Sequence, residues 1–468
     1  MTFFCKINLK NLIIFDKTKA IGGEEMGWIE RYFELDKYGT DVKTEVLAGL
    51  TTFMTMAYIL LVNPIILSNA MGKEAFDSLV AVTALSAGLT TILMGVYAKK
   101  PFALAPGMGL NAYFAYTVAP KYGWKVALAA VFVEGIIFII LSITKVRSAI
   151  IHAIPLSQKY AVGAGIGLFL TFIGLNNVGL LTASTTDKGV LQFTGLNANF
   201  LATPEGILFV FGVIFAGILI GLRIKGALLI SILATSILGW IFNIAPRPEG
   251  IVSLPTISYT FLKLDLHGLI NAGALGVVFA FFMVDFFDTL GTVTGLSAKA
   301  GFLTKEGKIP DAEKILLTDA IGTTFGALLG TSTVTTYIES AAGIEEGGRT
   351  GLTAVTTGLL LLLVGLFIAP IAKAIPSFAT APALIIVGYY MISAIKEVDF
   401  SDPTEAIPAF LVLITIPFTY SIADGIGVGF ISYTLLKVFT GRWKEVHPLM
   451  YILALVFIGY FAYLAGVF

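Results

Sequence analysis

The chain has 468 residues, of which 57% are hydrophobic and 13% are charged, and its 30 Lys and Arg residues balance 30 Asp and Glu residues. Soluble domains carry roughly 25% charged residues, so this composition excludes a soluble globule and predicts an integral protein of the lipid bilayer. The zero net charge excludes nucleic acid as a partner of a basic surface. The single cysteine, Cys5, excludes a disulfide framework and a cysteine-based zinc site.

Fifteen stretches are apolar and long enough to cross a bilayer as helices, which takes roughly 20 residues each. Continuous apolar runs such as 359–364 exclude a β-barrel, whose strands alternate in polarity. The sequence therefore predicts an all-α polytopic membrane protein, in which the last stretch either adds a span or lies differently. The fifteen stretches are 46–67, 76–97, 101–118, 124–143, 159–180, 204–222, 226–246, 268–293, 312–330, 331–346, 351–374, 379–396, 405–421, 423–440 and 447–467.

The distribution of Lys and Arg predicts the orientation, because these residues stay on the cytoplasmic side of the spans. With a cytoplasmic N-terminus and alternating spans, 23 of the 30 Lys and Arg residues lie inside. Residues 1–25 lack the apolar run of a cleavable signal peptide, and Met26 is an alternative start. Residues 28–37 have the pattern of a short amphipathic helix. We expect a multi-pass protein of the cell membrane with a cytoplasmic tail over 1–45.

The two halves of the chain resemble each other. At an offset of 233 residues, 87–112 aligns with 320–345. At a shorter offset, 154–155 aligns with 375–376, and the long loop at 181–203 explains the change of offset. Seven spans per copy is an odd number, so the copies have opposite orientations. Such inverted repeats are typical of alternating-access transporters, whose substrate binds near mid-membrane where broken helices meet.

Carboxylates within the predicted spans need an explanation, because each costs about 2.5–3.5 kcal/mol at the bilayer centre. Asp285 and Asp288 are three residues apart and share one helix face. A substrate or proton site explains them better than a helix cap or a pair with a loop lysine. For Glu134 and Asp319 we expect structural roles as hydrogen-bond partners between helices.

The two short stretches have the pattern of discontinuous spans. Residues 331–337 are β-branched and rich in hydroxyls, which is typical of a strand, and Glu339 and small residues follow. In 101–118, Pro106 and neighbouring glycines break the helix, which a membrane tolerates only at a cavity or inside the protein. Asn111 offers a donor and an acceptor there, either to a substrate or to freed backbone groups.

Three charged residues follow the second broken span, and we expect them to form an ion pair or a helix cap on the cytoplasmic side. They are Glu345, Glu346 and Arg349. The chain has no Walker A run, nucleophile elbow or HExxH motif, so an ATP-driven pump and a membrane hydrolase lack their signatures. The histidines lie near span ends and no grouping has metal-ligand spacing. We expect no enzyme activity, no cofactor and no metal.

Four motifs make the chain similar to a known family: 51–64 (TTFMTMAYILLVNP), 105–118 (APGMGLNAYFAYTV), 285–295 (DFFDTLGTVTG) and 338–355 (IESAAGIEEGGRTGLTAV). They resemble the adenine/guanine/hypoxanthine permeases, a branch of the nucleobase/ascorbate transporter superfamily that is similar to xanthine and uracil permeases. The resemblance covers about residues 27–445. It implies fourteen spans in two inverted seven-span repeats, with a short strand in spans three and ten.

The resemblance also implies a division into two domains. The first repeat is expected over 46–246 and the second over 268–468, with both contributing to a core and a gate domain. Superfamily members are often dimers, so a homodimer is possible by resemblance. The spans expected in the core domain lie near 46–143 and 268–374, and those of the gate domain near 159–246 and 379–467.

By resemblance, the carboxylate of span eight that contacts the base is Asp288, with Asp285 beside it, and the span-ten carboxylate is Glu339. The polar residue of span three is Asn111. A carboxylate offers two coplanar acceptors, which suit adjacent N–H donors of a planar purine. An aromatic side chain can stack on the ring. The stacking candidates are Tyr337, Phe286 and Phe287, and the repeat adds Thr55 opposite Asp288 and Pro106 opposite Glu339.

A neutral base gains no drive from the membrane potential, so uphill import needs a co-transported cation. A buried carboxyl group can carry a proton, so the proton is the expected cation and sodium the alternative. We assign this role to Asp288 or Asp285 and recognition mainly to Glu339. An anion carrier of the same fold is the alternative function, although carboxylates disfavour an anion. A membrane enzyme or a channel is a third hypothesis.

Overall fold

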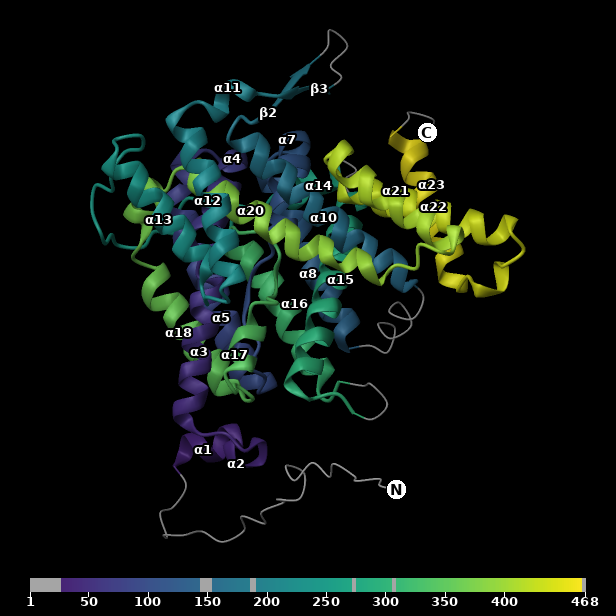
Figure 1. Ribbon diagram of the computed structural model, residues 1–468. Helices are drawn as coiled ribbons and strands as arrows, with labels where there is room; N and C mark the ends of the chain where they lie inside the picture. The colour runs from purple at the N-terminus through teal and green to yellow at the C-terminus, as the bar shows by residue number, and fades with distance from the viewer. Residues whose placement is uncertain (1–26, 144–153, 186–190, 272–274, 305–308, 465–468) are drawn as a thin grey trace, which may run out of the picture.

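The computed structural model describes residues 27–143, 154–185, 191–271, 275–304 and 309–464. The alternative start at Met26, the tail before it and His152 lie outside these residues. Figure 1 shows α1 and α2 at one end of the molecule and the β2–β3 hairpin at the other. Eight helices are long and apolar enough to span a membrane, and four more apolar helices are slightly shorter, within the described part of the chain.

The elements before residue 250 are α1 (Trp28–Phe33), α2 (Leu35–Tyr38), α3 (Val42–Met56), α4 (Ile59–Met71), η2 (Lys73–Ala75), α5 (Phe76–Leu93), η3 (Met94–Ala98), β1 (Leu104–Pro106), α6 (Met108–Ala112), η4 (Tyr113–Val118), α7 (Ala119–Tyr122), α8 (Trp124–Ile143), α10 (Leu156–Asn177), β2 (Leu181–Thr185), β3 (Leu191–Leu196), α11 (Ala198–Leu201), α12 (Pro204–Gly221) and α13 (Ala227–Ile241).

The elements after residue 250 are α14 (Leu266–Asn271), α15 (Leu275–Ala300), α16 (Ala312–Leu329), β4 (Val334–Thr336), α17 (Ser340–Glu345), α18 (Gly351–Gly365), α19 (Ala369–Ala374), α20 (Ser377–Ile392), η5 (Ser393–Glu397), α21 (Pro403–Thr419), α22 (Ile422–Phe439), η6 (Trp443–Glu445) and α23 (Pro448–Leu464).

The predicted spans are confirmed as elements of this fold. Each of the fifteen stretches contains a helix, and the two broken ones contain a strand followed by a short helix, β1 with α6 and β4 with α17. The expected strands of spans three and ten are therefore present. The fifteenth stretch forms α23, which packs on α22 and on α15, where the rings of Phe457 and Phe279 lie 5.6 Å apart.

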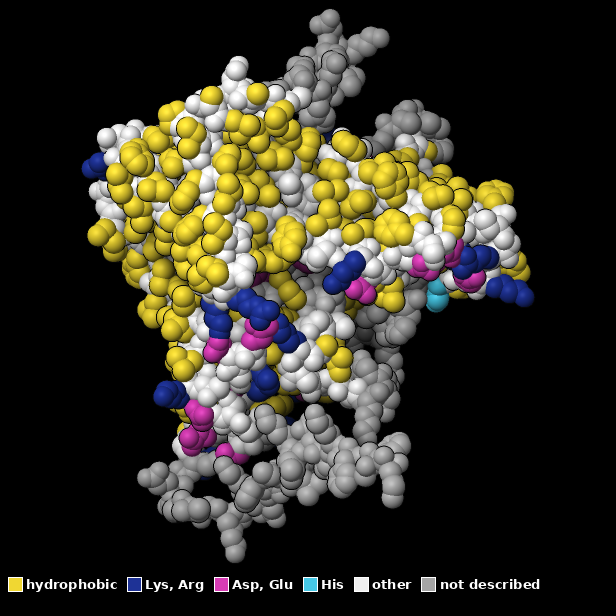
Figure 2. All heavy atoms as spheres, viewed as in Figure 1, with side chains coloured by type: hydrophobic (Ala, Val, Ile, Leu, Met, Phe, Trp, Pro, Cys, Tyr) yellow, Lys and Arg dark blue, Asp and Glu magenta, His cyan; other side chains and the backbone are white. Residues whose placement is uncertain are grey.

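The outer surface has the polarity of a membrane protein. Figure 2 shows hydrophobic side chains over a broad band of this face, with Lys, Arg, Asp and Glu gathered below it. The helix α12 illustrates the band, because Ile207, Ile214 and Ile218 are between 52% and 60% exposed. Exposed apolar side chains at helical spacing suit contact with lipid tails rather than with water.

The two strands meet inside the molecule and pair antiparallel about Ala105 and Thr335. Beyond the strand ends, the Gly107 N–H donates to the carbonyl of Thr333 at 2.9 Å, and the Tyr337 N–H donates to the carbonyl of Ala103 at 2.8 Å. Both strands are fully buried. The pairing therefore satisfies backbone groups that no lipid could satisfy.

The strands give the repeat its true register, because β1 begins at residue 104 and β4 at residue 334, an offset of 230. The Thr91 hydroxyl donates to the carbonyl of Leu104 at 3.0 Å, and the Thr323 hydroxyl donates to that of Val334 at 2.8 Å. These anchors precede their strands by 13 and 11 residues. Because the anchors are 232 residues apart and the strands 230, the offset of 233 is wrong at the strands, and Pro106 corresponds to Thr336 rather than to Glu339.

A second crossing relates α10 to α20. A Cβ built at Gly167 would lie 2.6 Å from the carbonyl oxygen of Gly388, and one at Gly388 would lie 2.4 Å from that of Gly167. The reciprocal contact relates residues 221 apart, which is also the offset between 154–155 and 375–376. The shorter repeat offset in this part of the sequence thus agrees with the structure.

We expect Gly167→Ala to destabilise the protein, because the added methyl group forces α10 and α20 apart. Overpacking of this kind costs about 1–3 kcal/mol. Thermal unfolding of the purified protein in detergent measures the effect. The matched control is Gly163→Ala on the same helix, where a Cβ meets nothing within 4 Å. That variant should keep or raise the melting temperature, and an equal loss in both variants would contradict the crossing.

The helices form two groups by their packing. In the first group, α8 packs on α15 and α16, α18 packs on α3 and α5, and the two strands lie among these helices. In the second group, α10 packs on α20 and α21, and α12 packs on α13 and α20. The packing of α8 on α16 corresponds to that of α18 on α5 in the opposite repeat, as an inverted repeat requires.

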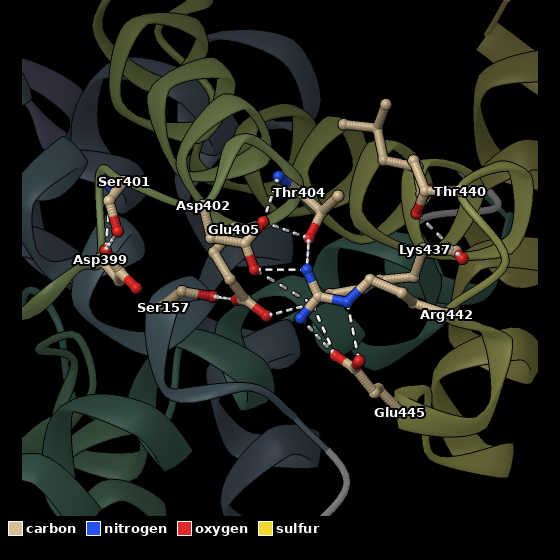
Figure 3. Close-up of polar contacts among 11 residues, drawn as sticks. Ser157, Asp399, Ser401, Asp402, Thr404, Glu405, Lys437, Thr440, Arg442 and Glu445 are labelled. Atoms are coloured by element: carbon tan, nitrogen blue, oxygen red, sulfur yellow. Dashed lines mark hydrogen bonds and ion pairs between the residues drawn. The ribbon is translucent and has the colours of Figure 1, made fainter.

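Charged side chains tie together one end of the second group (Figure 3). The fully buried Lys437 of α22 pairs with Glu405 of α21 at 2.8 Å and with Glu445 of η6 at 2.9 Å. Arg442 pairs with Asp402 at 2.6 Å and with Glu445 at 2.7 Å. The network joins α21, α22 and η6 into one body at this end.

The network makes a pH-dependent contribution to stability. The Thr404 hydroxyl and the Arg442 guanidinium hold the pKa of Asp402 well below its usual value, and Arg442 with Lys437 lowers the pKa of Glu445 to about 2. A lowered carboxyl pKa stabilises the fold above the unfolded pKa, and this contribution disappears as the pH falls through the folded pKa. Protonation should therefore remove it between about pH 4.5 and pH 2.

We expect Arg442→Gln to lower the melting temperature at pH 7, because it removes the ion pairs with Asp402 and Glu445. The loss should be only a few degrees, because the side chains of Arg442 and Glu445 are partly exposed and solvent screens their pair. The difference from wild type should shrink as the pH falls from about 4.5 toward 2. Melting curves over this pH range measure it. The control is Lys444→Gln, whose ammonium lies over the Trp443 ring; a constant difference at every pH would contradict the ion-pair explanation.

Candidate functional site

The site forms where the second broken span leaves β4. Glu339 directly precedes α17 and is half-buried, and its carboxylate Oε1 accepts a hydrogen bond from the Tyr58 hydroxyl at 2.7 Å. Tyr58 lies at the break between α3 and α4, which places its side chain beside α17. The Thr55 hydroxyl donates to the backbone carbonyl of Glu339 at 3.4 Å. Thr55 and Glu339 thus lie together.

Asp288 approaches the same place from α15. It is half-buried and lies close enough to Glu339 and Asp319 to be repelled by their negative charges. Tyr337 is near both Asp288 and Glu339 and is 5% exposed. Two carboxyl groups from separate elements therefore face a shared region beside the strands.

The strand crossing forms one side of this region. The carbonyl of Pro106 accepts the Tyr337 hydroxyl at 2.6 Å and the Asn111 side-chain amide at 3.3 Å. The Asn111 Oδ1 also accepts the hydroxyl of Ser332. Asn111 and Tyr337 thus serve the freed backbone of the broken spans, one of the two roles considered for Asn111, and they keep Pro106 at the crossing.

Asp285 faces a different direction from Asp288. It is fully buried and lies against Glu134 of α8 and Asp319 of α16. Three residues along a helix leave side chains about 60° apart around its axis. That angle is enough for Asp288 to face Glu339 while Asp285 faces the interior, so the expected pair on one face is divided between two environments.

Two aromatic residues alter the stacking prediction. Phe286 is fully buried, with ring centroids 6.2 Å from Phe138 and 5.5 Å from Phe282, so it packs in the core and is unavailable to a base. The side chain of Phe287 lies outside the described part of the structure. The sequence did not single out Tyr390 of α20, which is 46% exposed and lies near enough to Glu339 to feel its charge.

The side of the molecule near the hairpin is held closed by polar contacts between the two helix groups. The Asn177 side chain of α10 donates to the Tyr116 hydroxyl of η4 at 3.0 Å, and the Thr117 hydroxyl donates to the carbonyl of Tyr420. A cavity of about 110 Å³ lies beside them, lined among others by Ile66 and Leu384. On the other side Ile338, next to Glu339, is 51% exposed. The half-buried Glu339 therefore lies beside an exposed residue on the side opposite the hairpin.

The charged residues at the end of α17 form the ion pairs and the helix cap that the sequence predicts. Glu345 pairs with Lys299 at 2.5 Å, and Glu346 pairs with Lys225. The Arg349 guanidinium donates to the carbonyls of Ile344 and Gly348 at 2.5 and 2.8 Å, which caps the end of α17. Within the described residues, no group of three or more His, Cys, Asp or Glu side chains has an arrangement that holds a metal.

Comparison with known proteins identifies the family. Residues 43–428 match the model of the Permease family. The chain is 43% identical to a guanine/hypoxanthine permease of Bacillus subtilis over 93% of its length and all of the relative, and 42% identical to an adenine permease of Escherichia coli over 92% of its length and 95% of the relative.

A solved structure shares the fold. The transmembrane domain of a cyanobacterial bicarbonate transporter superposes with a TM-score of 0.60 at 17% identity, covering 82% of this chain and 97% of that one. The 7+7 inverted-repeat arrangement predicted from the sequence is thereby confirmed. At this identity the likeness concerns the fold alone.

Proposed function

The chain belongs to the Permease family, and from this premise we propose that it is a secondary active transporter that imports purine nucleobases across the cell membrane. The observation that carries the proposal is the convergence of Glu339 and Asp288 beside the strand crossing. The adenine and guanine/hypoxanthine permeases that it resembles, at 42% and 43% identity, support a purine as the substrate class. Family and relatives are permeases, so the protein is not an enzyme.

Recognition follows from the chemistry of the base. A purine is planar and uncharged, with N–H donors and ring-nitrogen acceptors around its edge. The carboxylate of Glu339, oriented by the Tyr58 hydroxyl, accepts adjacent N–H donors. Asp288 contacts the base from α15, while Thr55, Pro106, Asn111 and Tyr337 hold the backbone around it. Tyr390 of α20 offers an exposed ring for stacking.

Transport follows from relative movement of the two helix groups, for which we propose the roles of core and gate domain. Both carboxylates and both strands belong to the first group, so the base moves with the core. Contacts between the groups lie on the side near the hairpin, while Ile338, next to Glu339, is exposed on the other side. With the cytoplasmic N-terminus that the Lys and Arg distribution favours, we propose that this arrangement is an inward-facing state.

A co-transported cation supplies the drive for uphill uptake, and we propose a proton rather than sodium. The alternative function is anion transport, since a bicarbonate transporter shares the fold. The carboxylates at the site disfavour it, because an anion requires a cation or an unopposed helix N-terminus.

Uptake by proteoliposomes tests the proposal. Radiolabelled hypoxanthine, adenine, guanine and sulfate are offered under an imposed pH gradient, with and without sodium. We expect accumulation of at least one purine under the pH gradient without sodium, and none of sulfate. Uptake of sulfate but of no purine would contradict the proposed function, and accumulation driven by sodium alone would contradict proton coupling.

A further inference from the structure

Three carboxyl groups meet inside the first helix group: Glu134 of α8, Asp285 of α15 and Asp319 of α16, each fully buried. Asp319 is well supplied with donors, because the hydroxyls of Thr336 and Thr289 bond its two oxygens, each at 2.8 Å. An ionised carboxylate only accepts hydrogen bonds. Asp319 therefore has the surroundings of a charged group.

Glu134 has different surroundings. Its Oε2 accepts only a long contact from the Thr333 hydroxyl at 3.5 Å, and its Oε1 is buried without a hydrogen-bond partner among the described residues. The group within hydrogen-bonding reach of Glu134 is the carboxyl of Asp285. Among the described residues, the hydroxyl contacts of Asp285 are two long ones of 3.4 Å, with Thr289 and Thr323.

Two ionised carboxylates cannot bond each other, because both only accept. One proton makes one of them a donor to the other and removes one buried charge. The other titratable groups that face the pair are acidic, namely Asp319 and Asp288. The ion pairs found in the described residues bring no Lys, Arg or His to either member. A proton is thus the cation that the pair is built to hold.

We propose that Glu134 and Asp285 form the proton-binding site that couples transport, separate from the carboxylates that contact the base. The inference deepens the proposed function and rests on it. One proton from water on the outer side binds between the two carboxyl groups, crosses with the core, and returns to water on the inner side. No covalent bond other than the O–H bond forms or breaks.

The pair of Glu134 and Asp285 is connected to the two elements that position the base-binding carboxylates, β4 and α15. Glu134 contacts Thr333, the residue before β4, and β4 leads to Glu339. Asp285 lies one helix turn before Asp288 on α15. The Thr289 hydroxyl further joins Asp319 to the Thr335 hydroxyl of β4 at 2.9 Å. Whether the pair holds its proton therefore bears on the two elements that position the base.

The test separates binding from coupling in proteoliposomes. Counterflow exchange of labelled for unlabelled purine needs no net proton movement, whereas accumulation does. With one proton per base and the membrane potential clamped at zero, a gradient of one pH unit sustains about tenfold accumulation in the wild type. We expect Glu134→Gln to keep counterflow within about threefold of wild type but to lose the tenfold accumulation and the purine-driven acidification of the lumen.

A matched control is Asp424→Asn, which changes a carboxyl group of α22 that accepts the Tyr460 hydroxyl at 3.2 Å, away from the pair. It should keep both activities. Accumulation by Glu134→Gln equal to that of wild type would overturn the inference. Loss of counterflow by Glu134→Gln would also overturn it, because a pair that only couples the proton is not needed for purine exchange. A wild type that exchanges purine but accumulates it only under a sodium gradient would overturn the coupling site alone. A wild type without purine exchange would overturn the proposed function and this inference together.

Discussion

Replacing Glu339 by Gln should reduce purine uptake by roughly 100-fold while leaving the protein folded. The substitution keeps the size of the side chain but replaces one acceptor oxygen by a donor, which then faces the N–H donors of the base. Loss of a charge-assisted hydrogen-bond pair and the exposure of unpaired donors together amount to about 2–3 kcal/mol. Initial rates of labelled hypoxanthine uptake, corrected for the amount of inserted protein, measure the effect.

The neighbouring chain provides controls for Glu339. Glu345→Gln changes a carboxylate on the following helix that is 58% exposed and paired with Lys299, and it should leave uptake unchanged. Tyr58→Phe removes the hydroxyl that orients Glu339 and should have an intermediate effect, about tenfold. Equal loss in Glu339→Gln and Glu345→Gln would show that charge near α17, rather than contact with the base, determines the rate.

Glu45→Ala should produce the largest loss of stability of any single substitution considered. Glu45 of α3 is fully buried, and its carboxylate accepts the backbone N–H groups of Arg349, Thr350 and Thr353 at 2.9 to 3.2 Å. These groups lie at the start of α18, so Glu45 caps that helix from another one. Removing it leaves three donors unsatisfied, two of them on the buried residues Thr350 and Thr353, and we expect a loss of about 3 kcal/mol or more.

Thermal unfolding in detergent measures this prediction. The control is Asp41→Ala, because Asp41 caps only its own helix by accepting the N–H of Thr44 at 2.9 Å and is exposed. An N-cap of this kind contributes about 1 kcal/mol. A loss for Glu45→Ala no larger than that for Asp41→Ala would show that water replaces the cap of α18.

The spans and the two broken spans could be predicted from the sequence, because hydropathy and helix-breaking residues act locally. The stretch 331–337 reads as extended from its β-branched residues, and β4 lies within it. The repeat is detectable in the sequence, but its register is not, because the offset falls from 232 residues at the threonine anchors to 230 at the strands. The offset of 221 between α10 and α20 was visible only as two short dipeptides.

The partners of buried polar groups could not be predicted, because they depend on how separate helices pack. Glu134 and Asp319 each looked like an isolated hydrogen-bonding residue, and only the packing of α8, α15 and α16 brings them to Asp285. Tyr58 lies within a recognisable motif, yet nothing local distinguishes it from its apolar neighbours. The role of Glu45 as a cap of α18 could not be predicted either, because its partners are more than 300 residues away in the sequence.

We propose that Glu339 and Asp288 hold a flat, uncharged heterocycle beside the paired strands. A structure of the protein determined with hypoxanthine bound would show where the base lies. We expect density for the ring between the start of α17 and α15, with the Glu339 carboxylate within about 3 Å of a ring N–H. Density for the base elsewhere, with Glu339 and Asp288 contacting only protein, would contradict it.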